Sequence, residues 1–243
     1  MIIWNNCKFI NKKYIDFEKD ILSCGLITVP AAPAFVENEN NLYYWKALQS
    51  ADYSIIDSSL MALLARTKGF QVFKYSGYQL IKDTLNFLQS NDLSLFLINP
   101  NEASDKINKD YILTKTLVSS DNLQSYIAPF YRKNVIIEDW DLLERIKAIK
   151  PRLIIINIAG GKQEILGAFL KRNINFKTTI FCTGAAISFF TGAQAPIADC
   201  IDRFYLGWMA RILGNPKIFF PRYLNAFKFI RIFYKYKIEK RSL

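Results

Sequence analysis

The stretch "LIIINIAGGKQEILGAFLKR", residues 153–172, changes its pattern halfway along. Apolar, mostly β-branched residues fill its first part, up to Ile158, and such a run is typical of a buried strand. After Gly160 and Gly161 the apolar residues recur with helical spacing, which predicts a helix from Glu164 to Lys171. The stretch therefore predicts a strand joined to a helix by a glycine turn, with polar side chains at the junction.

The same alternation of strand and helix patterns continues along the chain. Further strands are predicted to end near Thr28, Asp57, Tyr75, Asn99 and Thr183. Further helices are predicted at residues 60–67, 80–88 and 140–149. This order predicts an α/β fold, Rossmann-like, in which helices flank a largely parallel sheet and a ligand binds at the carboxyl ends of the strands.

The composition limits the chemistry that the chain can carry. With 243 residues, of which 51% are hydrophobic, the chain can form one substantial core. The absence of histidine excludes Ser-His-Asp and Cys-His catalysis and removes the commonest metal ligand. Its four cysteines form no CxxC pair, which favours reduced, buried thiols. We find no signal peptide or membrane span in the pattern and expect a cytoplasmic protein.

Positive charge is concentrated at the C-terminal end. Residues 203–241 hold ten basic residues and one acid, so this segment carries +9 of the net charge of +11. We therefore predict two domains, a Rossmann-like body at 1–203 and a basic, aromatic appendage at 204–243.

On a helical wheel of the appendage, Lys228, Arg231 and Lys235 share one side. The neighbouring side carries Phe229, Ile232, Phe233 and Tyr236. This pattern predicts a helix that lies on the surface of an anionic membrane. Two alternatives stay open: a helix packed on the body with a solvated basic face, and a module that binds single-stranded RNA.

The glycine junction does not match the common nucleotide-binding motifs. No GxGxxG is present, and Ile156 and Gln163 occupy positions where a P-loop requires glycine and a hydroxyl residue. A helix N-terminus can nevertheless bind an anion through its unpaired N–H groups. The alternative is that the two glycines only form a tight turn.

Asp57 poses a similar choice at the end of the predicted strand "YSIID". It can cap the following helix, although Ser58 and Ser59 compete for that position. It can also act as a general base toward a hydroxyl in the cleft.

Several short motifs in order resemble those of the WecG/TagA/CpsF glycosyltransferase family. The segments are "ADYSIIDSS", "KYSG", "GGKQE", "TGAAISFFTGAQAP", "LGWMARILGNP" and "PRY", and the likeness runs from Thr28 to Tyr223. It implies an inverting, metal-independent transfer of a sugar, of the N-acetylmannosamine type or a related hexose, from a UDP-sugar to a polyprenyl-diphosphate-linked saccharide. The implied transfer needs no cofactor. The enzyme would be peripheral on the inner face of the cell membrane.

The resemblance also implies roles for individual residues. Asp57 takes the place of the catalytic base, Gln163 lies close to the reacting sugar, and Arg211 stabilises the leaving diphosphate. The implied substrate-binding residues are Thr28, Lys74, Gly160, Gly161, Lys162, Glu164, Gly184 and Arg222. Glu164 would contact either the ribose or its own helix.

Three departures from the family pattern are Pro30, Ser58 and Gly207, and they leave the identity of the sugar open. A membrane-associated scaffold that has lost transfer is the competing interpretation, followed by the RNA-binding module. The sequence also leaves open whether the protein forms a homo-oligomer.

Overall fold

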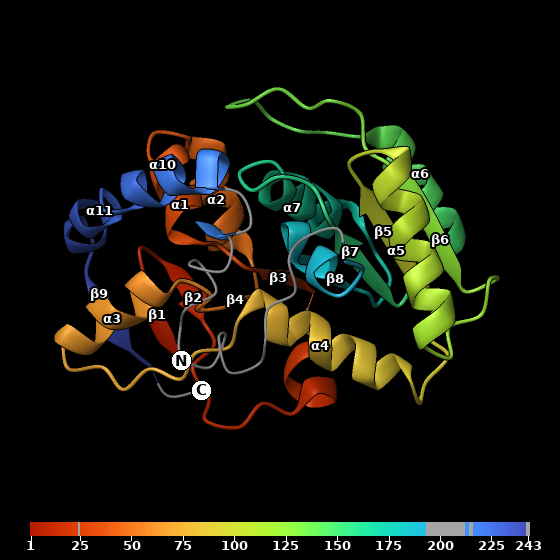
Figure 1. The fold of residues 1–243 in the computed structure, drawn as a ribbon, viewed down its shortest axis with the longest axis horizontal. Coiled ribbons are helices and arrows are strands. Elements are labelled where there is room, and N and C mark those ends of the chain that lie inside the picture. The colour runs from red at the N-terminus through yellow and green to blue at the C-terminus, as the bar shows by residue number, and fades with distance from the viewer. Residues whose placement is uncertain (24, 193–211, 214–215, 242–243) are drawn as a thin grey trace.

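The computed structural model describes residues 1–23, 25–192, 212–213 and 216–241. Its strands form one nine-stranded sheet in the order β6-β5-β7-β8-β3-β4-β2-β1-β9 (Figure 1). Neighbouring strands from β6 to β2 are parallel, whereas β1 is antiparallel to both β2 and β9. The strands are β1 (Ile2–Trp4), β2 (Cys7–Phe9), β3 (Leu26–Thr28), β4 (Tyr53–Ser54), β5 (Leu95–Asn99), β6 (Leu123–Ile127), β7 (Leu153–Ile156), β8 (Thr179–Cys182) and β9 (Ile238–Lys240).

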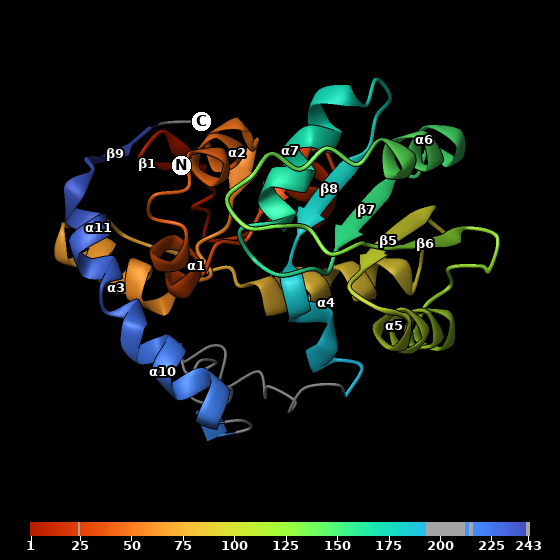
Figure 2. The ribbon, with the colours of Figure 1, turned by 90° about the horizontal axis from the view of Figure 1, so that it is seen from above.

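Helices cover both faces of this sheet. They are η1 (Phe17–Ile21), α1 (Ala32–Glu37), α2 (Leu42–Ser50), α3 (Ser59–Thr67), α4 (Gly77–Leu88), α5 (Glu102–Lys115), α6 (Trp140–Ile149), α7 (Gln163–Asn173), η2 (Gly184–Phe189), α10 (Pro216–Ala226) and α11 (Phe229–Lys235). Figure 2 shows α6 and α7 on one side of the central strands and α4 and α5 on the other. The predicted α/β fold with a largely parallel sheet is therefore confirmed.

One predicted strand, the apolar run that ends near Tyr75, is a loop. Its backbone is bound by side chains instead of a neighbouring strand: Asn11 Nδ2 donates to the Gln71 carbonyl at 2.8 Å, and the Phe73 N–H donates to Asn11 Oδ1 at 2.8 Å. The Val72 carbonyl accepts from the Arg66 guanidinium at 3.1 Å. Because these groups are already satisfied, the segment needs no ladder partner.

The C-terminal residues that the structure describes are part of the body. Strand β9 pairs with β1, so the sheet is not confined to the predicted body at 1–203 but includes a strand from the segment predicted as an appendage. Helix α11 buries Phe229, Ile232 and Phe233, which are 0–1% exposed, in a core cluster with Trp4. The predicted apolar face of the tail therefore packs on protein, and the packed-helix alternative describes these three residues correctly.

The boundary predicted between residues 203 and 204 lies outside the described residues. No helix in the described ranges is both long and apolar enough to cross a bilayer. Cys7 and Cys182 are buried free thiols, as predicted, and Cys24 and Cys200 also lie outside those ranges.

Candidate functional site

Asp57 lies in the loop between β4 and α3, at the carboxyl end of the sheet. The N-cap of α3 is Ser58, whose hydroxyl accepts a hydrogen bond from the Met61 N–H at 3.2 Å. The Asp57 Oδ1 atom instead accepts from the backbone N–H of Gly77 at 2.9 Å. Gly77 is the first residue of α4, so the carboxylate lies at the positive end of that helix dipole. The capping alternative for Asp57 is therefore wrong, and its side chain remains partly exposed.

Three strand ends converge on the start of α4. A Cβ atom on Gly77 would lie 3.0 Å from Val29 Cγ1, 3.7 Å from Asp57 Oδ1 and 3.8 Å from Ala186 Cβ. Val29 follows β3, Asp57 follows β4, and Ala186 belongs to η2 after β8. Gly77, the glycine of "KYSG", was not among the predicted site residues, because a glycine in a sequence indicates a close approach of the backbone without indicating its partner.

Glu164 lies in the first turn of α7 and is fully buried. Its Oε2 atom accepts from the Gly161 N–H at 2.7 Å and its Oε1 atom from Gln163 Nε2 at 3.2 Å. Burial raises the pKa of the Glu164 carboxyl to about 7, although these hydrogen bonds act to lower it. Of the two roles expected for Glu164, the structure shows the contact with its own helix turn.

Gly161 is a position that only glycine fits. Its φ of +86° lies in the left-handed region, and a Cβ atom there would lie 2.6 Å from Asn38 Oδ1. The tight-turn interpretation of the junction is therefore part of the answer. Asn38, in the segment after α1, was missed because nothing in its local sequence indicates this contact.

Gln163 connects the loops that follow β7 and β8. Its Oε1 atom accepts from the Gly184 N–H at 2.7 Å while its Nε2 atom donates to Glu164. Gly184 also has a positive φ of +57°. The carboxamide thus has a fixed orientation at the strand ends, with one donor hydrogen and one lone pair beyond these two bonds.

The other predicted site residues differ in how far they are buried. Thr28 is fully buried in β3, and its hydroxyl pairs with that of Ser54 at 2.7 Å. Lys162 is partly exposed, with its ammonium 4.2 Å from the ring centroid of Phe130. Lys74 and Gly160 are partly exposed in the loops before α4 and α7.

Two predicted arginines are not placed. Arg211 lies outside the described residues, and Arg222 belongs to α10 but its side chain lies outside the description. Their roles stay predictions.

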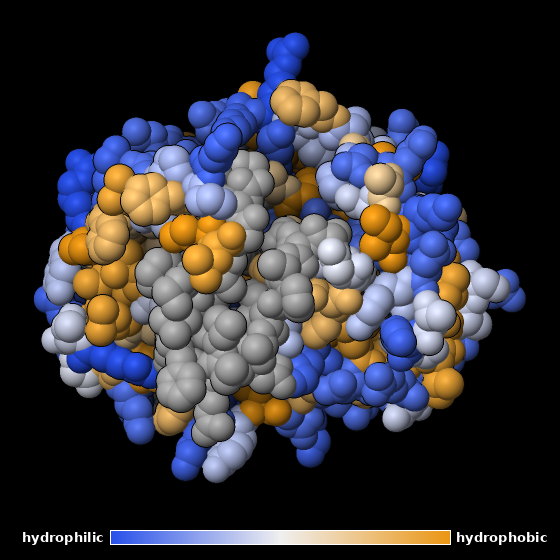
Figure 3. All heavy atoms as spheres, in the orientation of Figure 1, coloured by the Kyte–Doolittle hydropathy of each residue, from blue (hydrophilic) through white to orange (hydrophobic). Residues whose placement is uncertain are grey.

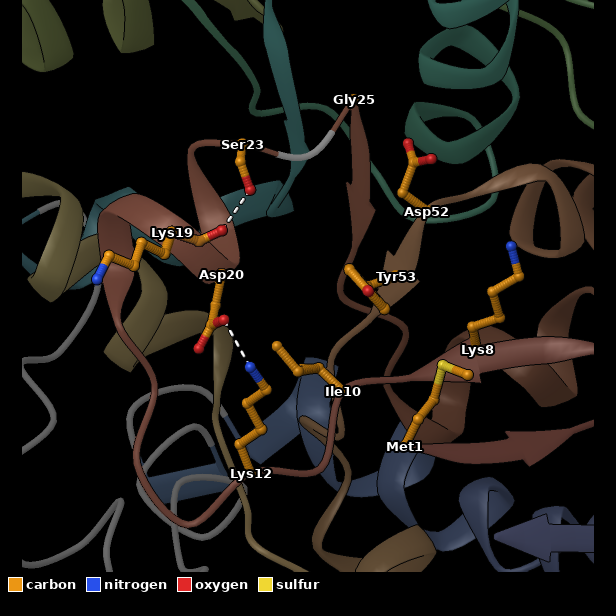
Figure 4. Close-up of a pocket in the computed structure, with 10 residues that line it drawn as sticks. All are labelled: Met1, Lys8, Ile10, Lys12, Lys19, Asp20, Ser23, Gly25, Asp52 and Tyr53. Carbon is orange, nitrogen blue, oxygen red and sulfur yellow. Dashed lines mark hydrogen bonds and ion pairs between the residues drawn. The ribbon is translucent and has the colours of Figure 1, made fainter. Parts of the chain in front are cut away.

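A depression of about 480 Å³ opens at the opposite end of the sheet (Figure 4). Gly25 and Asp52, which precede β3 and β4, line it together with Lys8 and Lys12. Both of its acids are paired: Asp20 with Lys12 at 2.6 Å and Asp52 with Lys171 at 2.8 Å. Because this depression lies at the amino ends of β3 and β4, and Asp57 follows the carboxyl end of β4, it is separate from the site around Asp57 and Gln163.

The model of the glycosyl transferase WecG/TagA/CpsF family matches residues 13–243. No curated protein matches the chain.

Proposed function

The chain belongs to the WecG/TagA/CpsF family of glycosyl transferases, and from that premise we propose which transfer it carries out. As a member it is a glycosyltransferase of cell-surface polysaccharide synthesis. The proposed donor is a UDP-sugar of the N-acetylmannosamine type or a related hexose. The proposed acceptor is a saccharide linked to polyprenyl diphosphate.

Asp57 is the proposed general base. The acceptor hydroxyl oxygen bonds to the anomeric carbon, the bond from that carbon to the UDP oxygen breaks, and the proton passes to the Asp57 carboxylate. Attack from the side opposite to UDP inverts the anomeric centre. The observation that carries this proposal is the position of the Asp57 carboxylate. Ser58, and not Asp57, caps α3, and the N–H of Gly77 orients the carboxylate at the strand end.

The remaining groups have proposed tasks around the departing UDP. The fixed Gln163 carboxamide offers its second N–H to the donor sugar beside the reacting bond. The leaving diphosphate requires cations, which Arg211, Arg222 and Lys74 would supply. Lys162 stands at the N-cap of α7, where a phosphate would also meet the positive end of the helix dipole.

Mutation of the base tests this proposal. Asp57→Asn should leave the melting temperature nearly unchanged and reduce sugar transfer at least about a hundredfold. Ser58→Ala is the matched control, because loss of the cap should cost about 1 kcal/mol of stability and little turnover. Equal turnover of parent and Asp57→Asn, with purified UDP-sugar and lipid-linked acceptor, would reject the role of Asp57.

A screen of UDP-sugars for thermal stabilisation distinguishes a glycosyltransferase from the two alternative functions, an inactive scaffold and an RNA-binding module. A ligand bound only by the native state raises the melting temperature. An inactive scaffold would show no turnover with any stabilising UDP-sugar. An RNA-binding module would bind RNA with a steep salt dependence and would not bind UDP.

We also propose that α10 docks on an anionic membrane surface. Large apolar side chains are exposed along it and just beyond it, at Phe220, Leu224 and Phe227, and the exposed Lys217 and Lys228 flank them in the sequence. Figure 3 shows apolar atoms at the surface on the side that carries α10 and α11. Apolar side chains flanked by lysines suit the headgroup region, where a lipid-linked acceptor is anchored.

This docking surface differs from the one expected from the sequence. Arg231, which was expected to face the membrane, forms an ion pair with Glu39, in which its Nη2 atom donates to both carboxylate oxygens, at 2.8 and 2.7 Å. Its charge is therefore partly neutralised by the body. Of the residues expected on the apolar side, Phe229, Ile232 and Phe233 lie in the core and Tyr236 is partly buried against it. The exposed apolar residues precede them, in α10 and just after its end.

A further inference from the structure

A row of polar side chains crosses the carboxyl ends of three neighbouring strands. Ile98, Ile156 and Cys182 are paired across β5, β7 and β8. The next positions on these strands are Asn99, Asn157 and Thr183, and all three side chains are at most 8% exposed. Because side chains alternate along a strand, the three point to the same face of the sheet.

The orientation of the Asn157 carboxamide follows from a chain of hydrogen bonds. Asn99 Nδ2 donates to Asp105 Oδ1 at 2.8 Å, and a carboxylate only accepts. Asn99 Oδ1 therefore faces away from Asp105, and it accepts from Asn108 Nδ2 at 2.8 Å and from Asn157 Nδ2 at 2.9 Å. With its amino group fixed in this way, Asn157 must direct its oxygen elsewhere.

Two buried oxygens in this row lack a hydrogen-bond partner in the described part of the chain. They are Asn157 Oδ1 and Thr183 Oγ1. Thr183 occupies the N-cap position of η2, where a hydroxyl ordinarily accepts a backbone N–H, yet it makes no capping bond. A buried polar atom without a partner is costly, and two on adjacent strands indicate a missing common partner.

We propose that Asn157 and Thr183 bind a hydroxyl group of the nucleotide-sugar donor. A hydroxyl can donate its hydrogen to Asn157 Oδ1 and accept the hydrogen of Thr183 at the same time. Neighbouring strands lie about 4.8 Å apart, so an oxygen between them can be about 2.8 Å from both atoms. This inference rests on the proposed function, since a UDP-sugar supplies hydroxyls from its ribose and from the transferred sugar.

The position of the pair fits a donor bound at the site described above. Thr183 directly precedes Gly184, whose N–H is held by Gln163. On β3, Val29 is the corresponding position, one residue beyond the Thr28–Cys182 pair, and it packs against Gly77, the partner of Asp57. The polar row therefore leads along the strand ends toward the proposed base.

Thr183→Val tests the pair with little change of shape. Calorimetric titration should show about tenfold weaker binding of the donor, because one hydrogen bond to the ligand is lost. The melting temperature of the free protein should not fall, since the hydroxyl has no hydrogen-bond partner among the described residues. Thr183→Ser, which keeps the hydroxyl, should restore most of the affinity.

Thr178→Val is the matched control. The Thr178 hydroxyl is also buried without a described partner, but it precedes β8 at the opposite end of the same strand. This variant should bind the donor like the parent.

Titration with different ligands shows whether the bound hydroxyl belongs to the ribose or to the transferred sugar. Weaker binding of UDP itself assigns the pair to the ribose, whereas a loss confined to UDP-N-acetylhexosamines assigns it to the transferred sugar. If Thr183→Val binds every ligand as tightly as the parent, the two oxygens hold only buried water and the inference fails. If the parent binds neither UDP nor any UDP-sugar, the proposed donor class fails with it.

Discussion

Two phenylalanines near the start of α11 lie two residues apart and are expected to respond oppositely to truncation. Phe229 is fully buried, with its ring stacked on Phe35 at a centroid distance of 5.0 Å and edge-on to Trp4 at 5.6 Å. Phe227 is 62% exposed. Phe229→Ala therefore tests the packing of this segment on the body, and Phe227→Ala tests its proposed contact with the membrane.

Phe229→Ala should be strongly destabilising. Removing a buried Phe costs about 3–5 kcal/mol, because the transferred apolar area is lost and a cavity remains. For a chain of this length the entropy of unfolding is roughly 0.5 kcal/mol per kelvin, from about 2.1 cal/mol/K per residue. The melting temperature should therefore fall by about 6–10 °C. Phe227→Ala should change it by less than about 1 °C, as is usual for an exposed side chain.

Differential scanning calorimetry and vesicle sedimentation measure the two effects. Phe227→Ala should weaken binding to anionic vesicles about tenfold, because an exposed aromatic ring no longer enters the headgroup region. A Phe229→Ala variant that melts within about 2 °C of the parent would refute the packing of α11. Unchanged vesicle binding by Phe227→Ala combined with Leu224→Ala would refute the docking surface.

Two further predictions concern the turn before α7. Gly161→Ala should cost at least about 2 kcal/mol, from a strained positive φ and a clash with Asn38, whereas Gly69→Ala should cost only about 1 kcal/mol in chemical denaturation, because its φ of +83° has open space around it. Burial raises the pKa of Glu164 from 4.5 to about 7, so the unfolded state binds fewer protons between these values and stability should fall as the pH rises from about 4.5 to 7. Glu164→Gln should remove roughly 3 kcal/mol of that pH dependence, and identical pH profiles of parent and variant would contradict the buried carboxyl.

The central part of the fold could be predicted because its elements carry long, regular patterns. The strands ending near Asn99 and Ile158 are continuous apolar runs, and the helix predicted at residues 140–149 has the bounds of α6. The run "FQVFKY" failed because its pattern is that of a strand while its hydrogen bonds come from Asn11, about 60 residues earlier. Strands of two or three residues, such as β1 and β9, contain too few positions to show alternation at all.

The tail shows a different limit of sequence patterns. A helical wheel identifies an apolar side but not what covers it, because lipid and a protein core favour the same residues. In α11 the cover is Trp4, from the first strand, whose indole Nε1 donates to the Phe233 carbonyl at 3.1 Å. The pairing of β9 with β1 is a second contact between these two ends of the chain.

The candidate site contains both features that local sequence could predict and contacts with distant segments that it could not. Local sequence placed Asp57, Gln163 and Gly184 at strand ends, because each follows an apolar run. It could not decide whether Asp57 caps α3, since that depends on the N–H of Gly77, 20 residues further on. Nor could it distinguish Gln163 from Glu164, adjacent polar residues of one helical turn. Their hydrogen bonds separate them: Glu164 accepts from the Gly161 N–H within its own turn, whereas Gln163 accepts from the Gly184 N–H and so joins this turn to the loop after β8.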